Sequence, residues 1–220
     1  MNQDQTTNFG KIIKEIPMAE RPVFISNIKE VGYVSIQNIN FEWFPGFSVK
    51  QKQKSIESFH KNYHKLAPTA NILEISSKSD KELGVALSAF NLMIKTKNNK
   101  KFSVETAFQA SKVFKLGGPF LDLYDKTSKE AKKDPRIKSS GELIHFQFFG
   151  RNWELEPKTL FYDWLYVNAL ALNKELSEEI IKYDSFTDIE FNPSKSINCQ
   201  AKSAALYVAL YRNGVLDDAI

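Results

Sequence analysis

The chain has very little cysteine: among its 220 residues only Cys199 carries a thiol. One thiol excludes an internal disulfide framework and a cysteine-based zinc site, and it fits a reducing cytoplasm. His60 and His64 lie four residues apart, the spacing of a two-histidine metal face on a helix, but no nearby glutamate completes a zincin pattern. We therefore expect helix-surface histidines, no metal site and no cofactor.

Long apolar runs are also missing. No stretch approaches the ~20 apolar residues of a membrane span, and the N-terminal MNQDQTTNFGKII lacks a long apolar core. The pair Gly117-Gly118 has neither the lysine of a Walker loop nor the three spaced glycines of a dinucleotide fingerprint, so helix termination explains it more simply. We expect a cytoplasmic protein with no membrane partner.

What is present is a core and a modest positive charge. Hydrophobic residues make up 42% of the chain and aromatic residues 13%, enough for one domain at residues 21–220 after a loosely ordered leader at 1–20. The formal charge is +4, with lysines clustered at residues 95–101 and 129–138. These clusters permit a polyanionic partner without requiring one.

Periodicity predicts the order of elements. Alternating segments at residues 21–27 and 32–44 predict strands, and residues 48–67 predict a helix with Ser48 as its N-cap. A strand into a turn at 71–79 and a buried strand or short helix at 83–95 precede a helix at 103–114. Loops and a short helix at 117–143, one long buried helix at 159–183 and a final helix ending at Gly214 complete the chain. The expected class is α+β, a predominantly helical single domain with a small β element.

Two groups of polar residues are candidates for chemistry. On a helix, Glu105, Gln109 and Lys112 fall at i, i+4 and i+7, so an acid, an amide and an amine share one stripe. From spacing alone, a solvated pair of surface charges is the favoured reading of this stripe and a pocket wall the alternative.

The second group lies in the segment from 185 to 200. Its carboxylates and amides alternate with apolar anchors that should draw the backbone inward, where polar groups need a ligand or one another. A ligand pocket and a hydrogen-bond network bracing the last helix both remain open. The polar residues are Asp188, Glu190, Asn192, Asn198 and Gln200, and the anchors are Phe186, Ile189, Phe191 and Ile197.

Four motifs in order resemble a known family. The segment SVETAFQASKVF resembles the S-V-E-x-x-F-Q-x-x-K helix of the NADAR (YbiA-like) family, and LSAFNL, EAKKDPR and GRNW resemble its other motifs. Further segments, RPVFISN, WFPGFSVKQKQKSI, EISSKSDKELG, GGPFLDL, FYDWLY and FTDIEFNPSKSINCQA, resemble the branch associated with DarT-type DNA ADP-ribosyltransferase toxins. In the YbiA branch a W-G-x-G-like segment takes the place of the last of these. The resemblance runs from about Arg21 to the C-terminal helix.

The resemblance implies a YbiA-like fold and an N-glycosidase that removes ADP-ribose from ADP-ribosylated guanine in DNA. ADP-ribose would be the product, and the protein would act as an antitoxin or repair enzyme beside a DarT-type toxin, with direct binding of the toxin left open. One alternative is an N-glycosidase acting on a small glycosylamine such as a riboflavin-pathway intermediate. Another is a non-catalytic reader of ADP-ribose.

The resemblance also implies roles for residues. Glu105 would protonate the departing amine or stabilise the sugar, and Lys112 would capture an opened ribose as an imine if its pKa is lowered. Asp188 or Glu190 would orient ribose hydroxyls or water. Trp153 would stack on a base, although a core role is more usual for tryptophan, and Arg136 with Lys132 would neutralise the pyrophosphate. The remaining expected substrate-binding residues are Ser88, Phe90, Asn91, Gln109, Asn192 and Asn198.

Overall fold

The computed structural model describes residues 16–28 and 32–220. Of these residues 39% are helical and 21% lie in strands of three sheets, so the α+β class is confirmed and the prediction that helices predominate is wrong. The strands are β1 (Met18–Ser26), β2 (Val34–Glu42), β3 (Ile72–Glu74), β4 (Met93–Lys95), β5 (Lys101–Ser103), β6 (Lys112–Phe114), β7 (Leu143–Phe148), β8 (Arg151–Trp153) and β9 (Ser185–Thr187). The helices are α1 (Val49–His64), α2 (Glu82–Ala86), α3 (Val104–Ala110), the 3-10 turn η1 (Leu121–Asp125), α4 (Ser128–Lys133), α5 (Arg136–Ser139), α6 (Leu160–Ala171), α7 (Lys174–Ile180), α8 (Gln200–Arg212) and α9 (Leu216–Ala219).

The largest sheet has the strand order β2-β1-β9-β3. The antiparallel pair β1 and β2 confirms the two strands expected near the N-terminus, and β9 runs antiparallel to β1 and parallel to β3. Strand β1 begins at Met18, inside the segment expected to be a leader, while residues 1–15 lie outside the described part of the chain. The polar segment at 188–200 therefore begins in the middle of the sheet, at the end of the short strand β9.

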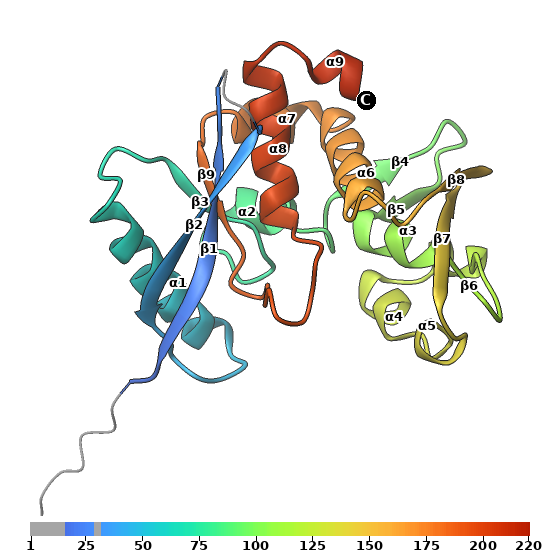
Figure 1. The fold of residues 1–220 in the computed structure, drawn as a ribbon, viewed down its shortest axis with the longest axis horizontal. Helices are drawn as coiled ribbons and strands as arrows, with labels where there is room; N and C mark the ends of the chain where they lie inside the picture. Colours follow the sequence, from blue (N-terminus) through green and yellow to red (C-terminus); the bar gives the residue numbers. More distant parts are fainter. Residues whose placement is uncertain (1–15, 29–31) are drawn as a thin grey trace, which may run out of the picture.

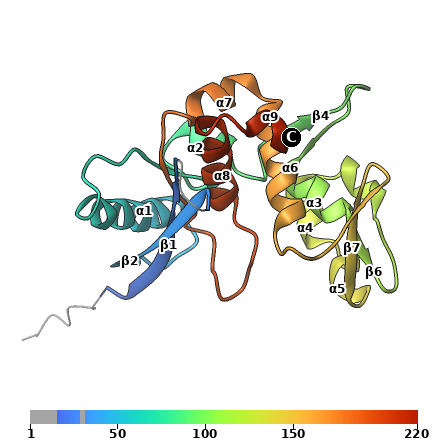
Figure 2. The ribbon, with the colours of Figure 1, turned by 45° about the horizontal axis from the view of Figure 1, so that its top comes forward.

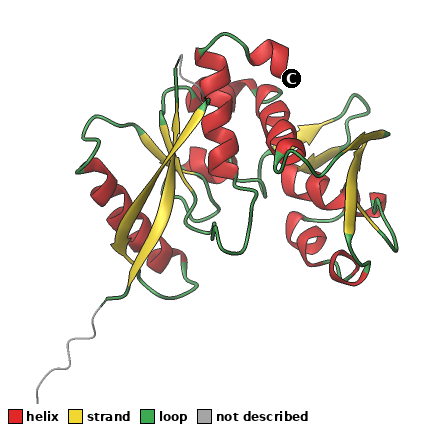
Figure 3. Cartoon of the chain, viewed as in Figure 1, coloured by secondary structure: helices red, strands yellow, loops and turns green. Residues whose placement is uncertain are grey.

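Helices cover both faces of this sheet (Figures 1 and 3). Alternate residues of a strand point to opposite faces, and accordingly Val23 packs in the cluster with α1 while Phe24 packs in the cluster with α8. Helix α1 begins as predicted, because the Ser48 Oγ accepts a hydrogen bond from the Gln51 backbone N–H. The final helix is also confirmed, with Gly214 in the left-handed region at φ 69°.

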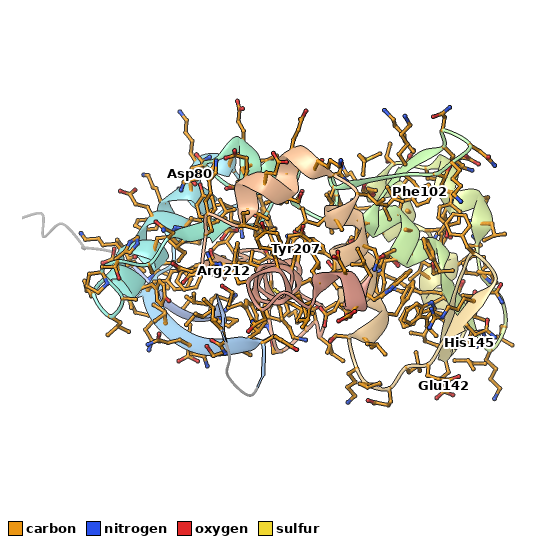
Figure 4. The ribbon with its side chains drawn as sticks, turned by 90° about the horizontal axis from the view of Figure 1, so that it is seen from above. Asp80, Phe102, Glu142, His145, Tyr207 and Arg212 are labelled. Carbon is orange, nitrogen blue, oxygen red and sulfur yellow. The ribbon has the colours of Figure 1, made fainter. Side chains whose placement is uncertain are left out.

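The other half of the molecule holds the hairpin β4–β5, the sheet β6-β7-β8 and helices α3, α4 and α5 (Figure 2). Helix α6 packs against both α3 and α8 and so joins the two halves into one core. Seen from above, Tyr207 and Arg212 on α8 lie near the middle, whereas Phe102 and His145 lie in the second half (Figure 4). Arg212 fastens α8 to the first half by donating to the carbonyls of Ile181 and Tyr183.

Two predicted helices are shorter than expected. The helix predicted for 103–114 ends at Ala110, because residues from Lys112 onward pair with β7 as strand β6. The helix predicted for 159–183 divides into α6 and α7 at Asn173, whose amide donates to the carbonyls of Ala169 and Met93. Segment 83–95 contains part of the short helix α2 and strand β4, so both alternatives occur there. In the described ranges, no helix is both long and apolar enough to cross a lipid bilayer.

Candidate functional site

A cavity of about 780 Å³ lies between the two halves of the molecule. Its walls come from α3, β6 and β7, from the loop 154–159 before α6, and from the loop that follows β9. We call it the central pocket. The polar residues that line it are Ser76, Ser77, Ser88, Glu105, Gln109, Lys112, Lys132, Glu154, Glu156, Lys158, Thr159, Tyr162, Asp188, Glu190, Lys195, Ser196, Asn198 and Gln200.

Helix α3 brings an acid to the pocket wall. All seven residues of the helix are buried, and Ser103 caps it by accepting from the Thr106 backbone N–H. The Glu105 side chain is only 8% exposed, so the solvated-surface reading does not hold for it. Its Oε1 accepts a hydrogen bond of 2.9 Å from Gln109 Nε2 and lies 3.7 Å from Lys132 Nζ. The carboxylate is thus held by one amide and one partly exposed cation.

Lys112 joins this arrangement from strand β6 rather than from the helix. Its Nζ donates a 2.8 Å hydrogen bond to Gln109 Oε1 and lies 4.8 Å from the Phe108 ring centre. Gln109 therefore links the amine to the acid. The pKa of Lys112 is lowered to about 8, chiefly by burial, with Glu105 opposing the change and Lys132 adding to it. An amine that is partly neutral near physiological pH is a candidate nucleophile or base.

Asp188 faces the pocket from the opposite wall. Its Oδ1 accepts the backbone N–H groups of Glu190 and Phe191, which fixes the loop that leaves β9. Burial and the neighbouring carboxylate of Glu74 raise the pKa of Asp188 well above its usual value. Burial likewise raises the pKa of Glu74. Two adjacent buried carboxyl groups cannot both ionise cheaply, so the pair retains a proton.

Glu74 clamps the chain on both sides of Asp188. One Glu74 oxygen accepts the Ile189 N–H at 2.8 Å and the other accepts the Thr187 hydroxyl at 2.7 Å. Thr187 in turn lies 2.8 Å from His60 Nε2. Burial lowers the pKa of His60 to about 3, so this ring is neutral, and its expected place on an open helix surface is wrong. Contacts among α1, β3 and β9 thus fix the position of the Asp188 carboxyl group at the pocket.

Several other residues expected at the site do lie at the pocket. Ser88, Phe90 and Asn198 line it, although Ser88 Oγ already donates to the Val85 carbonyl. Lys132 Nζ lies 4.9 Å from the Phe90 ring centre. Glu190 stands at the rim, paired at 3.2 Å with Lys52 of α1.

Four expected residues lie away from the pocket walls. Asn91 is exposed and donates to the Val85 carbonyl, and Asn192 accepts from Ser194 within its own turn. Arg136 is held by Asp122 and Asp134, which raise its pKa. Trp153 packs on Phe161 and Trp164 in the core, and its buried Nε1 has no hydrogen-bond partner among the described residues.

Ile197 is also misplaced by the sequence reading, because it is 61% exposed and anchors nothing. In contrast, Phe186 and Ile189 are buried as expected. The loop therefore folds inward at its start, around Asp188, and again at Asn198, while the stretch between stays open to solvent. This shape forms one side of the pocket mouth.

Sequence reasoning missed two contributors, Glu74 and Tyr162. Glu74 is a lone acid in the apolar run NILEI, and a charge within a buried strand was the signal available. Gln200, one of the polar residues expected to turn inward, accepts from the Ala89 N–H and donates to the Ile75 carbonyl. Tyr162 also lines the pocket. Its pKa is raised chiefly by burial, and the nearby carboxylates of Glu105 and Asp188 raise it further. As far as the chain is described, no group of three or more His, Cys, Asp or Glu side chains could hold a metal ion.

The fold and site define an α+β protein with a polar pocket between an acid-and-amine wall and a buried carboxyl pair. The comparisons give the family: the model of the DarT1-associated NADAR antitoxins matches residues 19–220, and the chain belongs to that family. This confirms the resemblance seen in the sequence. A search of curated proteins finds no match.

Proposed function

We propose that this protein hydrolyses the N-glycosidic bond between ADP-ribose and guanine in DNA and so reverses the modification made by a DarT-type toxin. One observation carries the proposal: Gln109 bridges the buried carboxylate of Glu105 to the amine of Lys112, whose pKa burial lowers to about 8. Membership of the DarT1-associated family supports the choice of substrate.

The size and charge of the central pocket suit ADP-ribose. Its volume of about 780 Å³ falls within the ~300–1,000 Å³ of small-molecule sites. Lys132, Lys158 and Lys195 supply cations for a pyrophosphate. On the other wall, Asp188 has hydrogen-bond acceptors and, in its protonated form, a donor for ribose hydroxyls. This division of charge matches a ligand with an anionic centre and two sugars.

Cleavage requires a proton for the departing guanine and a nucleophile for the anomeric carbon. The bond between C1 of ribose and the guanine nitrogen breaks, positive charge develops on the sugar, and water supplies the new C1–OH bond. The Glu105 carboxylate stabilises that charge and takes the proton from water. Of the carboxyl pair, Asp188 is our choice to hold the proton and donate it to the departing guanine nitrogen, because both oxygens of Glu74 already accept hydrogen bonds.

Lys112 offers a second route. A ribose joined to an amine can open to an imine, and a neutral lysine can exchange with that amine, releasing guanine and leaving the sugar on the enzyme until water frees it. With a pKa of about 8, roughly a tenth of Lys112 is neutral at pH 7, against a few parts in ten thousand for an ordinary lysine. Glu105, which Gln109 links to the amine, then acts as the proton shuttle.

A panel of substrates tests this proposal. We expect release of ADP-ribose from a guanine-ADP-ribosylated oligonucleotide and no turnover of a riboflavin-pathway glycosylamine. Turnover of the glycosylamine alone would favour the small-molecule enzyme instead. Tight binding of ADP-ribose without release from any substrate would favour a reader.

The lysine route has its own test. Borohydride added during turnover should fix the mass of the sugar on Lys112, located by peptide mapping. Full activity with no trapped adduct would assign direct hydrolysis through Glu105.

A further inference from the structure

Beside the pocket mouth lies a surface whose chemistry the hydrolysis does not use. It comprises the turn between β2 and the start of α1, with Trp43, Phe44, Phe47, Lys50, Lys52 and Lys54, and we call it the α1 entrance surface. In Figure 1 this turn lies at the lower edge of the sheet, on the side toward the loop that follows β9. The ion pair between Lys52 and Glu190 joins it directly to the rim of the central pocket.

Phe47 is the least expected residue on this surface. Its side chain is 98% exposed, with no described residue covering the ring. Gly46, the residue before Phe47, has φ 136°, a conformation that favours glycine in the turn. Exposing a whole phenylalanine gives up the free energy that burying its ring would contribute. A ring presented in this way is suited to stack on a flat partner.

Cations surround the neighbouring aromatic rings. Lys52 Nζ lies 4.4 Å from the Trp43 ring centre, and the Arg21 guanidinium lies 5.7 Å from it. Lys54 Nζ lies 5.9 Å from the Phe44 ring centre. The first turn of α1, all of it described, carries no acidic residue. The surface therefore combines an open ring with positive charge.

We propose that the α1 entrance surface binds the single-stranded DNA next to the modified guanine, with Phe47 stacking on an unpaired base and Lys50 and Lys54 contacting phosphates. Sequence-tolerant binding of single strands uses this pairing of stacking rings with a basic track. The inference rests on the proposed function for its choice of polymer. Because Lys52 of this surface pairs with Glu190 at the pocket rim, a strand bound on the surface would adjoin the pocket that holds ADP-ribose.

The test compares one modification in two settings. ADP-ribosyl-guanosine and a short single-stranded oligonucleotide with one ADP-ribosylated guanine are each assayed with wild type and with Phe47→Ala. Loss of one stacked base predicts roughly a tenfold fall in kcat/KM on the oligonucleotide. The nucleoside rate should stay unchanged, which also shows that the variant is folded. Equal effects on both substrates, or no effect on the oligonucleotide, would overturn the proposal.

Matched controls isolate the surface from general charge and hydrophobicity. Phe149→Ala removes another exposed ring, at the turn between β7 and β8, and should leave the oligonucleotide rate unchanged. Lys50→Ala should lower the salt slope of binding to unmodified oligothymidine by about 0.7, the value for one single-strand phosphate contact. Lys61→Ala, at the far end of the same helix, should not change the slope.

The binding assay also separates the two proposals. If the wild type hydrolyses neither substrate, the proposed function fails, yet weaker binding of oligothymidine by Phe47→Ala would still support the surface. If the wild type is active and Phe47→Ala binds and cleaves the oligonucleotide normally, the surface proposal fails alone. Equal loss on a fully paired duplex would contradict stacking on an unpaired base.

Discussion

Replacing Lys112 by Met should inactivate the protein and at the same time stabilise it. Met keeps the length of the side chain but removes the ammonium group that burial disfavours. Since the folded-state pKa is below 10.5, the unfolded chain binds the proton more tightly, and Lys112 costs stability at every pH below about 8. The variant escapes that cost.

The magnitude follows from the pKa. A fall from 10.5 to about 8, at about 1.4 kcal/mol per pKa unit, sets an upper limit of about 3 kcal/mol. Loss of the hydrogen bond from Lys112 to Gln109 destabilises the variant by about 1 kcal/mol. We therefore expect a gain of about 2 kcal/mol at pH 7, or roughly 4–8 °C in melting temperature for a chain of this size.

The stability difference between wild type and Lys112→Met depends on pH. Between pH 8 and pH 10.5 the folded wild type has lost the proton that its unfolded chain keeps, so wild-type stability rises relative to the variant. The advantage of Lys112→Met should shrink by about 2 kcal/mol between pH 7 and pH 10 in urea unfolding. The exposed neighbour Lys115→Met is the control and should show no such trend. A variant less stable than wild type, or a constant difference across pH, would refute a desolvated Lys112.

Three further outcomes are expected. Glu105→Gln should keep the fold and the bond to Gln109 but lower kcat by about 100-fold or more, as loss of an acid–base group does; near wild-type turnover would remove Glu105 from the mechanism. Glu74→Gln keeps the size of the Glu74 side chain but removes its charge, so the pKa of Asp188 should fall. The loss of activity that accompanies deprotonation of Asp188 should then begin at a lower pH than in wild type. An unchanged pH–rate profile would contradict this. Turnover should survive EDTA, and a loss restored by a divalent ion would point to a metal.

The order of elements could be predicted where local chemistry decides it. Helix α1 begins after Ser48 because the Ser48 side chain can accept a hydrogen bond from a backbone N–H. Apolar and polar residues alternate in β1 and β2 because the two faces of the sheet have different neighbours. Both signals are local, so sequence contains them. The end of α3 is different, because Lys112 leaves the helix to pair with Phe146, more than thirty residues later in the chain. Long-range pairing of this kind overrides local propensity.

The candidate site was partly predictable for the same reason. Glu105, Gln109 and Lys112 fell on one predicted stripe, and Asp188 lay in a polar segment expected to turn inward. Glu74 could be found only as an acid in an apolar strand, since its partners Thr187 and Ile189 lie far away in sequence. Arg136 and Trp153 were expected at the pocket but lie away from it. Sequence spacing does not show that Arg136 pairs with Asp122 and Asp134, or that Trp153 packs against Trp164 in the core.

The mass of the DNA product tests the central claim most directly. A single-stranded oligonucleotide carrying one ADP-ribosylated guanine is incubated with wild type and with Glu105→Gln, and the oligonucleotide is then weighed by mass spectrometry. Cleavage at the N-glycosidic bond predicts that wild type restores the mass of unmodified DNA and releases one ADP-ribose per strand, while the variant leaves the substrate intact. An unchanged mass with folded wild type, or a ribose phosphate left on the guanine, would contradict the account.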